Sequence, residues 1–298
     1  PIEESSNCNT KRSSNILFED NFNESDIDTN SWSHETKNTP WFNNEAQFYT
    51  APDGNTGNST SNAFVEDGLL KIQPILENIS LDNGYTFSYS STRLISRSKK
   101  SFGYDTDIII CFKLPEGEGM WPAIWMMPQT DDAWPEGGEI DIMEARGRLP
   151  LEISSTVHFG VNSNGIYEHQ YLDPGYAYVS SEENFHDNFH SITFKWRENS
   201  IRMFLDNRTV PYFETTNDFY RFSTLGYPFS DHEFYILLNV AVGGHFGGTN
   251  EWKNIGNVNA QYPRNPELFC NNRQCTNHAN PDKKRLLVDW IQVVRSMD

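Results

Sequence analysis

Short segments in which apolar and polar residues alternate cover most of the chain, and Gly, Asn, Pro and Ser separate them. Segment 190–206 shows this best, because apolar residues take every second position on both sides of the polar turn 197–200, as in a β-hairpin. Further strands are predicted at 64–72, 85–95, 103–113, 120–127, 154–159, 234–242 and 286–294, and another within 134–147. No segment keeps a 3.6-residue period, so we expect little helix. The pattern predicts an all-β fold, a sandwich or jelly roll.

The chain of 298 residues contains neither an internal repeat nor a linker, so we expect one domain over residues 15–298. Residues 1–14 are polar and predict a disordered N-terminal tail. The chain begins at Pro1 without Met, which indicates a processed or trimmed form.

Composition narrows the choice of partner. The formal net charge of −18 argues against nucleic acid and against an anionic membrane surface, whereas a neutral polymer is compatible with it. No apolar run approaches the roughly 20 residues of a membrane span. Aromatic residues make up 14% of the chain, with 8 Trp, and a sugar-binding cleft needs such rings for stacking. Such rings can equally be core residues, so composition is compatible with a neutral polymer as partner without requiring one, and we expect the chain to be a monomer.

Segment 134–147 concentrates acidic residues in an unusual way. Glu139 and Asp141 should point the same way on a strand, whereas Glu144 would fall on the opposite face. One extra residue, inserted as a β-bulge that Met143 should mark, returns Glu144 to the face of the other two. The alternative is a solvated acidic strand, but the interleaved Ile and Met residues indicate half-burial. Three like charges on one face cost stability, which indicates a functional site.

These residues resemble a known family. The sequence Glu139-Ile-Asp141-Ile-Met-Glu144 is similar to the ExDxxE signature of glycoside hydrolase family 16, the laminarinase-like enzymes. Segments 119–128, 156–160, 239–244 and 288–294 also match in order, so the resemblance runs from about residue 18 to about residue 294. It implies a β-jelly roll of two stacked antiparallel sheets, with a cleft across the concave face.

The resemblance also implies roles for the acids. Glu139 would be the nucleophile, Glu144 the general acid and then base, and Asp141 would tune both, in a retaining mechanism. We expect no cofactor in catalysis. A lone strand His is commonly a core residue, but the resemblance makes His158 a support that orients Asp141 or the leaving sugar.

The predicted cleft holds five further residues. Trp121 and Trp134 should lie near the cleaved bond, and Trp125 either shares their face or packs in the core. Asn44 and Arg93 resemble residues that bind sugar hydroxyls on the non-reducing side, although Arg93 could instead be a salt-bridge partner. His245 and Phe246 stand where family members often carry Asn-Trp, a departure that affects this loop's contacts.

A structural calcium ion is implied by the same resemblance, away from the cleft. Its ligands would be Glu19, Asp289 and the backbone carbonyl near Gly68, which suit an oxygen-binding cation. The alternative is that Glu19 and Asp289 are ordinary polar positions on edge strands.

Four cysteines and four N-glycosylation sequons, at Asn23, Asn58, Asn78 and Asn207, favour a secreted, extracellular glycoprotein. Cys270 and Cys275 are the preferred disulfide, being close in the chain. Cys111 fits a buried thiol, and a Cys8–Cys111 bridge is the alternative.

The leading hypothesis is therefore a secreted endo-β-1,3-glucanase that acts on laminarin and conceivably on mixed-linkage β-1,3-1,4-glucan. The alternatives are a non-catalytic β-glucan recognition protein, whose relatives typically lose a catalytic glutamate, and a transglycosylase of the same family. Glu139 and Glu144 are both present, which favours an enzyme.

Overall fold

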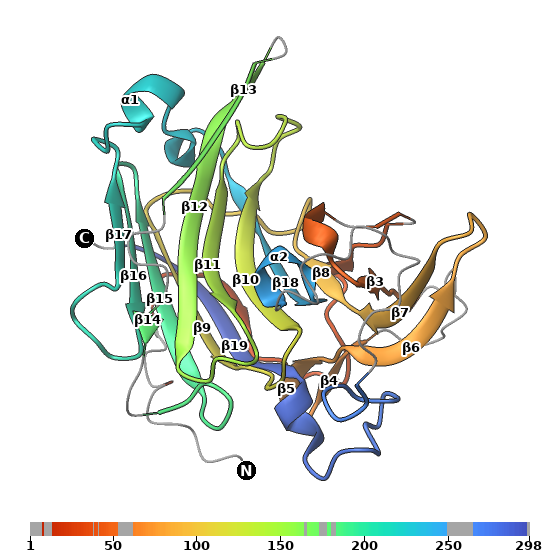
Figure 1. Ribbon diagram of the computed structural model, residues 1–298. Helices are drawn as coiled ribbons and strands as arrows, with labels where there is room; N and C mark the ends of the chain where they lie inside the picture. The colour runs from red at the N-terminus through yellow and green to blue at the C-terminus, as the bar shows by residue number, and fades with distance from the viewer. Residues whose placement is uncertain are drawn as a thin grey trace.

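Two large antiparallel β-sheets face each other in the computed structural model (Figure 1). The model describes residues 8, 14–37, 39–40, 42–52, 62–163, 166–172, 178–179, 183–248 and 265–296. Apart from residues 8 and 14, the predicted tail lies outside this set, as does the sequon at Asn58. The prediction of an all-β jelly roll is confirmed.

The first sheet forms the outer layer, and its strands in spatial order are β17 (Phe213–Thr216), β16 (Ser200–Leu205), β15 (His190–Arg197), β9 (Thr106–Lys113), β19 (Leu286–Arg295), β5 (Leu69–Ile72) and β4 (Ala63–Glu66). Strand β1 (Ile16–Asp20) also pairs with β19.

The second sheet carries segment 134–147, and its strands in spatial order are β13 (Ile166–Leu172), β12 (Glu152–Ser163), β11 (Glu139–Ala145), β10 (Met120–Pro128), β18 (Phe234–Val242), β8 (Arg93–Ile95) and β2 (Ser33–His34). Strand β14 (Tyr178–Val179) also pairs with β12.

The core lies between these sheets, where the alternating apolar residues of both meet. In the predicted hairpin, Ile192, Phe194 and Trp196 of β15 point inward and are at most 1% exposed. Ile140 and Ile142 of β11 enter the same core from the second sheet. Period-two alternation thus assigns one face of each strand to the core and leaves the other face free for chemistry.

A small third sheet departs from the expected architecture. It contains β3 (Gln47–Tyr49), β7 (Thr86–Ser91) and β6 (Ile75–Ser80), and β3 pairs with β7 in parallel. Segment 85–95, predicted as one strand, divides at Thr92 between β7 and β8, which belong to different sheets. Segment 64–72 likewise divides into β4 and β5 at a turn in which Asp67 and Gly68 both have positive φ.

Helix is scarce, as predicted. The described helices are α1 (Phe222–Leu225) and α2 (Gly244–Gly247), together with 3-10 turns at Phe42–Asn44, Pro228–Ser230 and Pro281–Lys284. Within the described part of the chain, no helix has both the length and the apolar character needed to cross a membrane.

Two disulfides close very different loops. Cys270–Cys275 confirms the preferred pairing. The expectation of a free buried thiol at Cys111 is wrong, because Cys111 is bonded to Cys8, 103 residues away in the sequence. Cys8, Ile109, Cys111 and Trp290 form a separate buried cluster in which Cys8 lies against the central strands β9 and β19. The alternation of β9 places Cys111 on the face of that strand away from the main core.

The two disulfides should contribute unequally to stability. In the chain-entropy model, closing a loop of about 100 residues stabilises by about 5 kcal/mol, and closing a five-residue loop by about 2 kcal/mol. We expect Cys8→Ala/Cys111→Ala to lower the free energy of unfolding more than Cys270→Ala/Cys275→Ala does, measured by guanidinium titration. Equal losses in the two double variants would contradict this account.

Candidate active site

Strand β11 presents the three acids on the face of the sheet that points away from the core. Glu139 lies opposite His158, Asp141 opposite Thr156 and Glu144 opposite Ser154 on β12. Three residue steps from Asp141 to Glu144 therefore match two steps on β12, which is the signature of a β-bulge. The predicted bulge is confirmed.

The extra residue is Ile142 and not Met143. On the other side of β11, Met143 lies opposite Ile124 and Asp141 lies opposite Trp125, so Ile142 has no counterpart on β10. Both Ile142 and Met143 are buried in the core, at 1% and 0% exposure. Two consecutive side chains thus point inward, and Glu144 turns back to the face of the other acids.

Side chains hold the bulge in place. The Ser155 hydroxyl donates to the carbonyl oxygen of Ile142 at 2.7 Å, and the Tyr212 hydroxyl lies 2.9 Å from the same Ser155 oxygen. A bulge leaves backbone groups outside the regular ladder, and a buried carbonyl without a donor costs about 1–3 kcal/mol. Ser155 of β12 supplies the missing donor.

Each glutamate accepts a hydrogen bond from a tryptophan. The indole Nε1 of Trp134 donates to Glu139 Oε2 at 2.7 Å, and that of Trp121 donates to Glu144 Oε1 at 2.8 Å. Trp134 is 37% exposed, and its loop is tied down by Asn162, whose Nδ2 donates to the Trp134 carbonyl oxygen at 2.9 Å. The two predicted tryptophans therefore reach the two predicted glutamates.

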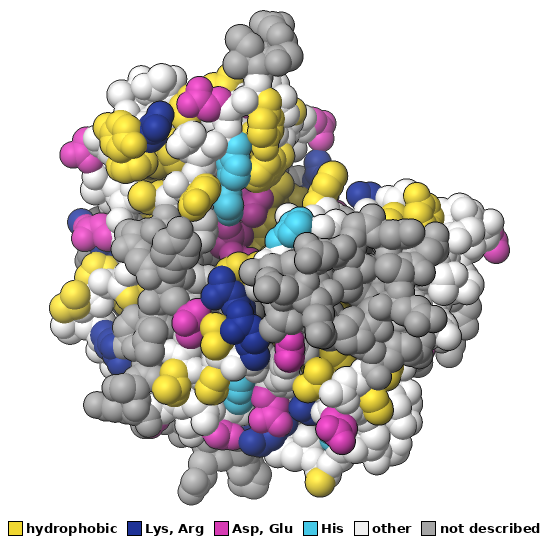
Figure 2. Space-filling view, viewed as in Figure 1, with side chains coloured by type: hydrophobic (Ala, Val, Ile, Leu, Met, Phe, Trp, Pro, Cys, Tyr) yellow, Lys and Arg dark blue, Asp and Glu magenta, His cyan; other side chains and the backbone are white. Residues whose placement is uncertain are grey.

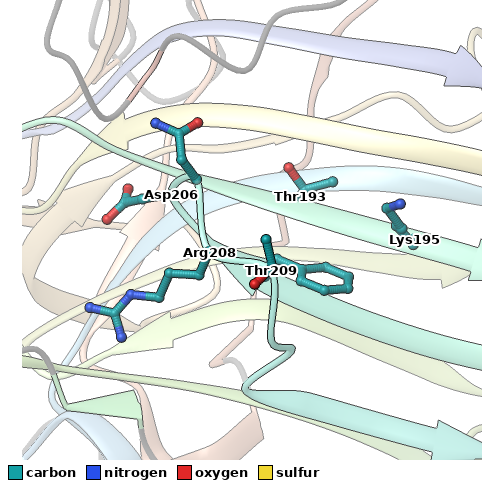
Figure 3. Close-up of a pocket in the computed structure, with 7 residues that line it drawn as sticks. Thr193, Lys195, Asp206, Arg208 and Thr209 are labelled. Carbon is teal, nitrogen blue, oxygen red and sulfur yellow. The ribbon is translucent and has the colours of Figure 1, made fainter.

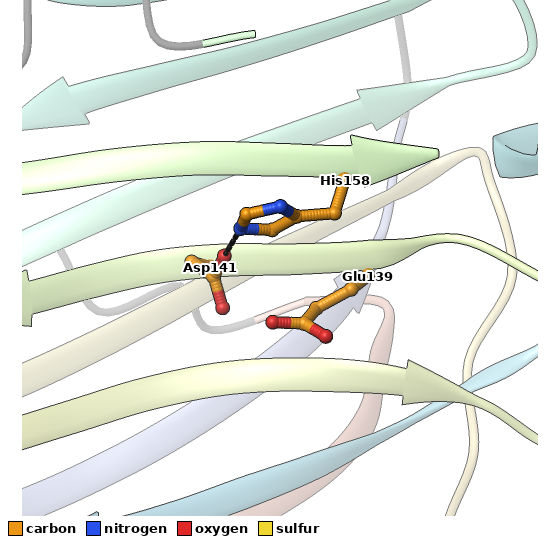
Figure 4. Close-up of side chains that lie close together, drawn as sticks. All are labelled: Glu139, Asp141 and His158. Carbon is orange, nitrogen blue, oxygen red and sulfur yellow. Dashed lines mark ion pairs between the residues drawn. The ribbon is translucent and has the colours of Figure 1, made fainter. Parts of the chain in front are cut away.

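Asp141 lies between the glutamates and faces His158. Its Oδ2 is 3.1 Å from His158 Nε2, and Figure 4 shows this ion pair beside Glu139. Figure 2 shows histidine and acidic side chains meeting in a hollow at the middle of this face, with hydrophobic side chains beside them. His158 therefore contacts Asp141, the residue that it was expected to orient.

Burial and mutual repulsion raise the pKa values of Asp141 and Glu144. Burial, and then the charge of Glu139, raise the pKa of Asp141. Burial, and then the charge of Asp141, raise the pKa of Glu144 to about 8. Burial opposes a charge on His158, but its hydrogen bond to Asp141 and the surrounding carboxylates outweigh this and raise its pKa to about 9. At neutral pH, Glu144 therefore keeps its proton and His158 is a cation.

Trp121 is more enclosed than a stacking platform would be. It is 9% exposed, and helix α2 covers it so closely that a Cβ on Gly247 would come within 2.7 Å of its Cβ. Phe246 of α2 packs on the indole with ring centres 5.3 Å apart, and the Arg146 guanidinium lies 4.1 Å from the Phe246 ring centre. Phe246 stands where family members often carry Trp, and its ring still makes an aromatic contact with Trp121.

The other predicted cleft residues lie on the same sheet, toward β8. Trp125 is half-buried, and its Nε1 donates to Asn239 Oδ1 at 2.7 Å, so it lies on the acid face and not in the core. The guanidinium carbon of Arg93 lies 4.5 Å from the Trp125 ring centre, and its Nε lies 2.8 Å from Glu35 Oε2. Arg93 therefore makes a salt bridge, which was the alternative to sugar binding, and it also lies beside a cleft tryptophan.

Asn44 belongs to the loop that meets α2. Its Nδ2 lies 3.1 Å from Nε2 of His245. His245, which stands where family members often carry Asn, therefore contacts a predicted sugar-binding residue. A Cβ on Gly244 would come within 2.8 Å of the Asn43 carbonyl oxygen, and glycine is therefore needed where the two segments meet.

Strand β13 adds residues that the sequence reasoning missed. Tyr167, His169 and Tyr171 alternate along it and face the site, and Tyr171 lies opposite His158. His169 packs on Trp134 with ring centres 4.5 Å apart. The Tyr-x-His-x-Tyr pattern was the available signal, but it lacks the aliphatic residues that usually mark a strand.

Among the described residues, the one group of three side chains with closely spaced metal-ligating atoms is Glu139, Asp141 and His158, within 4.8 Å of one another. Within this group His158 Nε2 and Asp141 Oδ2 are already paired at 3.1 Å, an arrangement that suits acid–base work.

A second hollow lies on the outer face of the first sheet, over β15, the end of β16 and residues 206–209 that follow it (Figure 3). It is lined by residues that include Lys195, Asp206 and Arg208. Its one lining carboxylate, Asp206, lies 3.1 Å from the buried His190 Nδ1. A single engaged carboxylate offers no acid–base pair, so the site on β11 is the candidate active site.

A family model described as Glycosyl hydrolases family 16 matches residues 55–262. The chain belongs to this family. This family 16 chain is 34% identical over 248 residues to Glucan endo-1,3-beta-glucosidase A1 of Niallia circulans; the match covers 78% of this chain and 34% of that relative. The chain thus spans about a third of that relative's length.

Two shorter relatives are matched over most of their length. Glucan endo-1,3-beta-glucosidase of Cryptopygus antarcticus is 33% identical over 239 residues, covering 78% of this chain and 81% of that protein. The structure of endo-beta-1,3-glucanase from Pyrococcus furiosus superposes with a TM-score of 0.70 at 28% identity, covering 93% of each chain.

The coupling between Asp141 and Glu144 can be measured directly. In Asp141→Asn the repulsion from Asp141 is gone while burial remains, so we expect the pKa of Glu144 to fall. The pKa of His158 should fall too, because its hydrogen-bonded counter-charge is removed. NMR titration of the folded protein measures both values, the first on the carboxyl carbon of Glu144 and the second on the ring of His158.

Glu198→Gln is a matched control, since it removes one exposed negative charge from the turn between β15 and β16. It should leave both pKa values unchanged. An unchanged Glu144 pKa in Asp141→Asn would show that the two carboxyls do not interact.

Proposed function

We propose that this protein is a secreted endo-β-1,3-glucanase that hydrolyses β-1,3-glucan, such as laminarin, with retention of anomeric configuration. One observation carries the proposal: Glu139 and Glu144 share a face of β11, and each accepts an indole N–H in the hollow around Asp141. Retaining glycosidases need two carboxyls about 5–5.5 Å apart, one as nucleophile and one as proton donor. The relatives named above as endo-1,3-β-glucosidases support the substrate.

In the first step, a Glu139 oxygen attacks the anomeric carbon and forms an ester to the sugar, while the bond to the leaving oxygen breaks. Glu144 gives its proton to that oxygen. The raised pKa of Glu144 keeps the proton available at neutral pH. The Trp134 hydrogen bond occupies Oε2 of Glu139 and orients the carboxylate for attack.

In the second step, water attacks the anomeric carbon and Glu144, now ionised, takes a proton from that water. The ester bond breaks and Glu139 is released as a carboxylate. The charge of Asp141 opposes ionisation of Glu144, and the His158 cation offsets part of the negative charge of the cluster. Neither step requires a cofactor.

The electrostatics of the site favour a neutral polymer. Three acids line its centre, and the chain carries a net charge of −18, so a sulfated galactan would be repelled. Trp125, Arg93 and Asn44 lie toward one end of the cleft, and we assign to them the non-reducing side of the cut. Mixed-linkage β-1,3-1,4-glucan is the second substrate that we propose.

Two other functions share this fold. A β-glucan recognition protein would need neither the raised pKa of Glu144 nor its indole partner, so the intact acid pair favours hydrolysis. A transglycosylase would use the same acids with a sugar in place of water in the second step. Analysis of the products over time separates these two reactions. Two disulfides support secretion, because they persist in oxidising compartments.

We also propose that a structural calcium ion is held where β1 and β5 meet the bulge of β19. Asp20 lies opposite Ile291 and Leu70 lies opposite Val288, so Asp289 falls in the gap between the two ladders. Glu19 and Gly68 lie next to this gap on β1 and just before β5. Carboxylate and carbonyl oxygens from these segments suit calcium, which would tie the three strands together.

The activity is tested by incubating the protein with laminarin, lichenan, curdlan and agarose and following new reducing ends. We expect release from laminarin first, and none from agarose. Glu139→Gln should abolish release while laminarin still binds, because the amide keeps the shape of the side chain but cannot form the ester. Release from none of the four polymers would favour the recognition protein, and parent activity in Glu139→Gln would remove the nucleophile assignment.

Calcium should raise the melting temperature by binding the folded state alone. We expect a higher Tm in calcium than in a chelator, with unchanged activity on laminarin at 25 °C. Asp289→Asn should abolish the difference, since it weakens a carboxylate ligand. A calcium-independent Tm in the parent protein would refute the site.

A further inference from the structure

His169 has no role in the mechanism above, although it contacts two of its parts. Its Nε2 lies 2.9 Å from Nδ1 of His158, on the side of that ring opposite Asp141. Its ring also packs on Trp134, the donor to Glu139, with centres 4.5 Å apart. One side chain of β13 therefore touches the supports of both Asp141 and Glu139.

The two imidazoles are arranged for a direct hydrogen bond. Their centres are 5.1 Å apart and their planes are inclined by 23°. The distance between centres exceeds that between the two nitrogens by 2.2 Å, roughly two ring radii, so the nitrogens lie close to the line that joins the centres. A proton on one ring then points straight at the lone pair of the other.

Charge decides the direction of this bond. His158 faces Asp141, Glu139 and Glu144 on β11, and its pKa is raised, so it carries protons on both nitrogens. On β13 its neighbours are His169 and Tyr171. Burial, and then the charge of His158, lower the pKa of His169 to about 4, so His169 is neutral and can accept.

We propose that His169 is a positioning residue of the catalytic cluster: it accepts the Nδ1 proton of His158 and so holds the ring with Nε2–H on Asp141. The inference rests on the proposed function for its effect on catalysis. Its geometric part concerns the two histidines alone. In this role His169 acts on the reacting groups through His158 and Asp141.

The surrounding strands are built to bring His169 to this place. Its partner on β12 is Gly160, where a Cβ would lie 1.9 Å from the Glu168 carbonyl oxygen and 3.0 Å from Pro135 Cγ. The missing side chain lets the Trp134–Pro135 loop pack against the strand. On the same face of β13, Tyr167 and Tyr171 are 56% and 55% exposed, whereas His169 is half-buried.

Three variants separate the acceptor from the packing. His169→Phe keeps a ring against Trp134 and removes the acceptor, whereas His169→Gln supplies an amide oxygen that can accept. Glu168→Gln changes an exposed residue on the other face of β13 and is the matched control. Melting temperatures show whether each variant is folded.

The first measurement is nitrogen-15 NMR of the His158 ring, which needs no substrate. In the parent protein we expect both ring nitrogens protonated at neutral pH. The pKa of His158 should fall in His169→Phe, stay close to the parent value in His169→Gln and be unchanged in Glu168→Gln. An unprotonated Nδ1 in the parent would overturn the proposal even if His169→Phe did not fold.

The second measurement is kcat and KM on laminarin. A hydrogen bond to a charged group lost from the transition state lowers kcat by about ten- to a hundredfold, and KM should change by less than about threefold. His169→Gln should recover most of kcat. Equal losses in His169→Phe and His169→Gln, or no loss in His169→Phe, would overturn the role. If the parent released no sugar, the proposed function would fail and the NMR result would alone decide the placement of the proton.

Discussion

The constraint on which this site depends is the repulsion among three carboxyl groups that lie close together on one strand, Asp141 buried and the two glutamates half-buried. Placing them together is unfavourable unless protons or donors offset their charge. The structure uses both. Glu144 keeps its proton, each glutamate receives an indole N–H, and His158 brings a positive charge to Asp141. The same compensation leaves Glu144 protonated at neutral pH beside Glu139, which is the arrangement that the proposed mechanism needs.

The strand that carries the acids also contributes to the core between the two sheets. Inward-facing residues of β11 join the core that both sheets share, so the strand that carries the acids is anchored from behind. Its donors come from neighbouring strands and loops: Trp121 from β10, His158 from β12 and Trp134 from the loop before β11. The site therefore has the rigidity of a central sheet, with a loop and the strand β13 closing one side.

Local pattern predicted much of this arrangement. Alternation located most strands, and the spacing of Glu139, Asp141 and Glu144 predicted a bulge, because both depend on backbone period alone. What sequence could not supply depends on distant partners. The 85–95 segment divides because its two halves pair with different sheets, and Cys8 meets Cys111 across 103 residues. The predicted position of the bulge was wrong by one residue, Met143 instead of Ile142. Both residues are apolar, and only the register against β10 distinguishes them.

The bulge affects the direction in which the Glu144 side chain points. A strand one residue shorter between Asp141 and Glu144 would alternate regularly and would still leave all three acids on one face. Exposure of Glu144 therefore does not distinguish the bulged strand from that shorter one. Its effect is on local twist, because a bulge bends its strand and increases the right-handed rotation of the residues after it. Ile142 thus affects the direction in which the Glu144 side chain leaves the strand relative to Glu139 and Asp141.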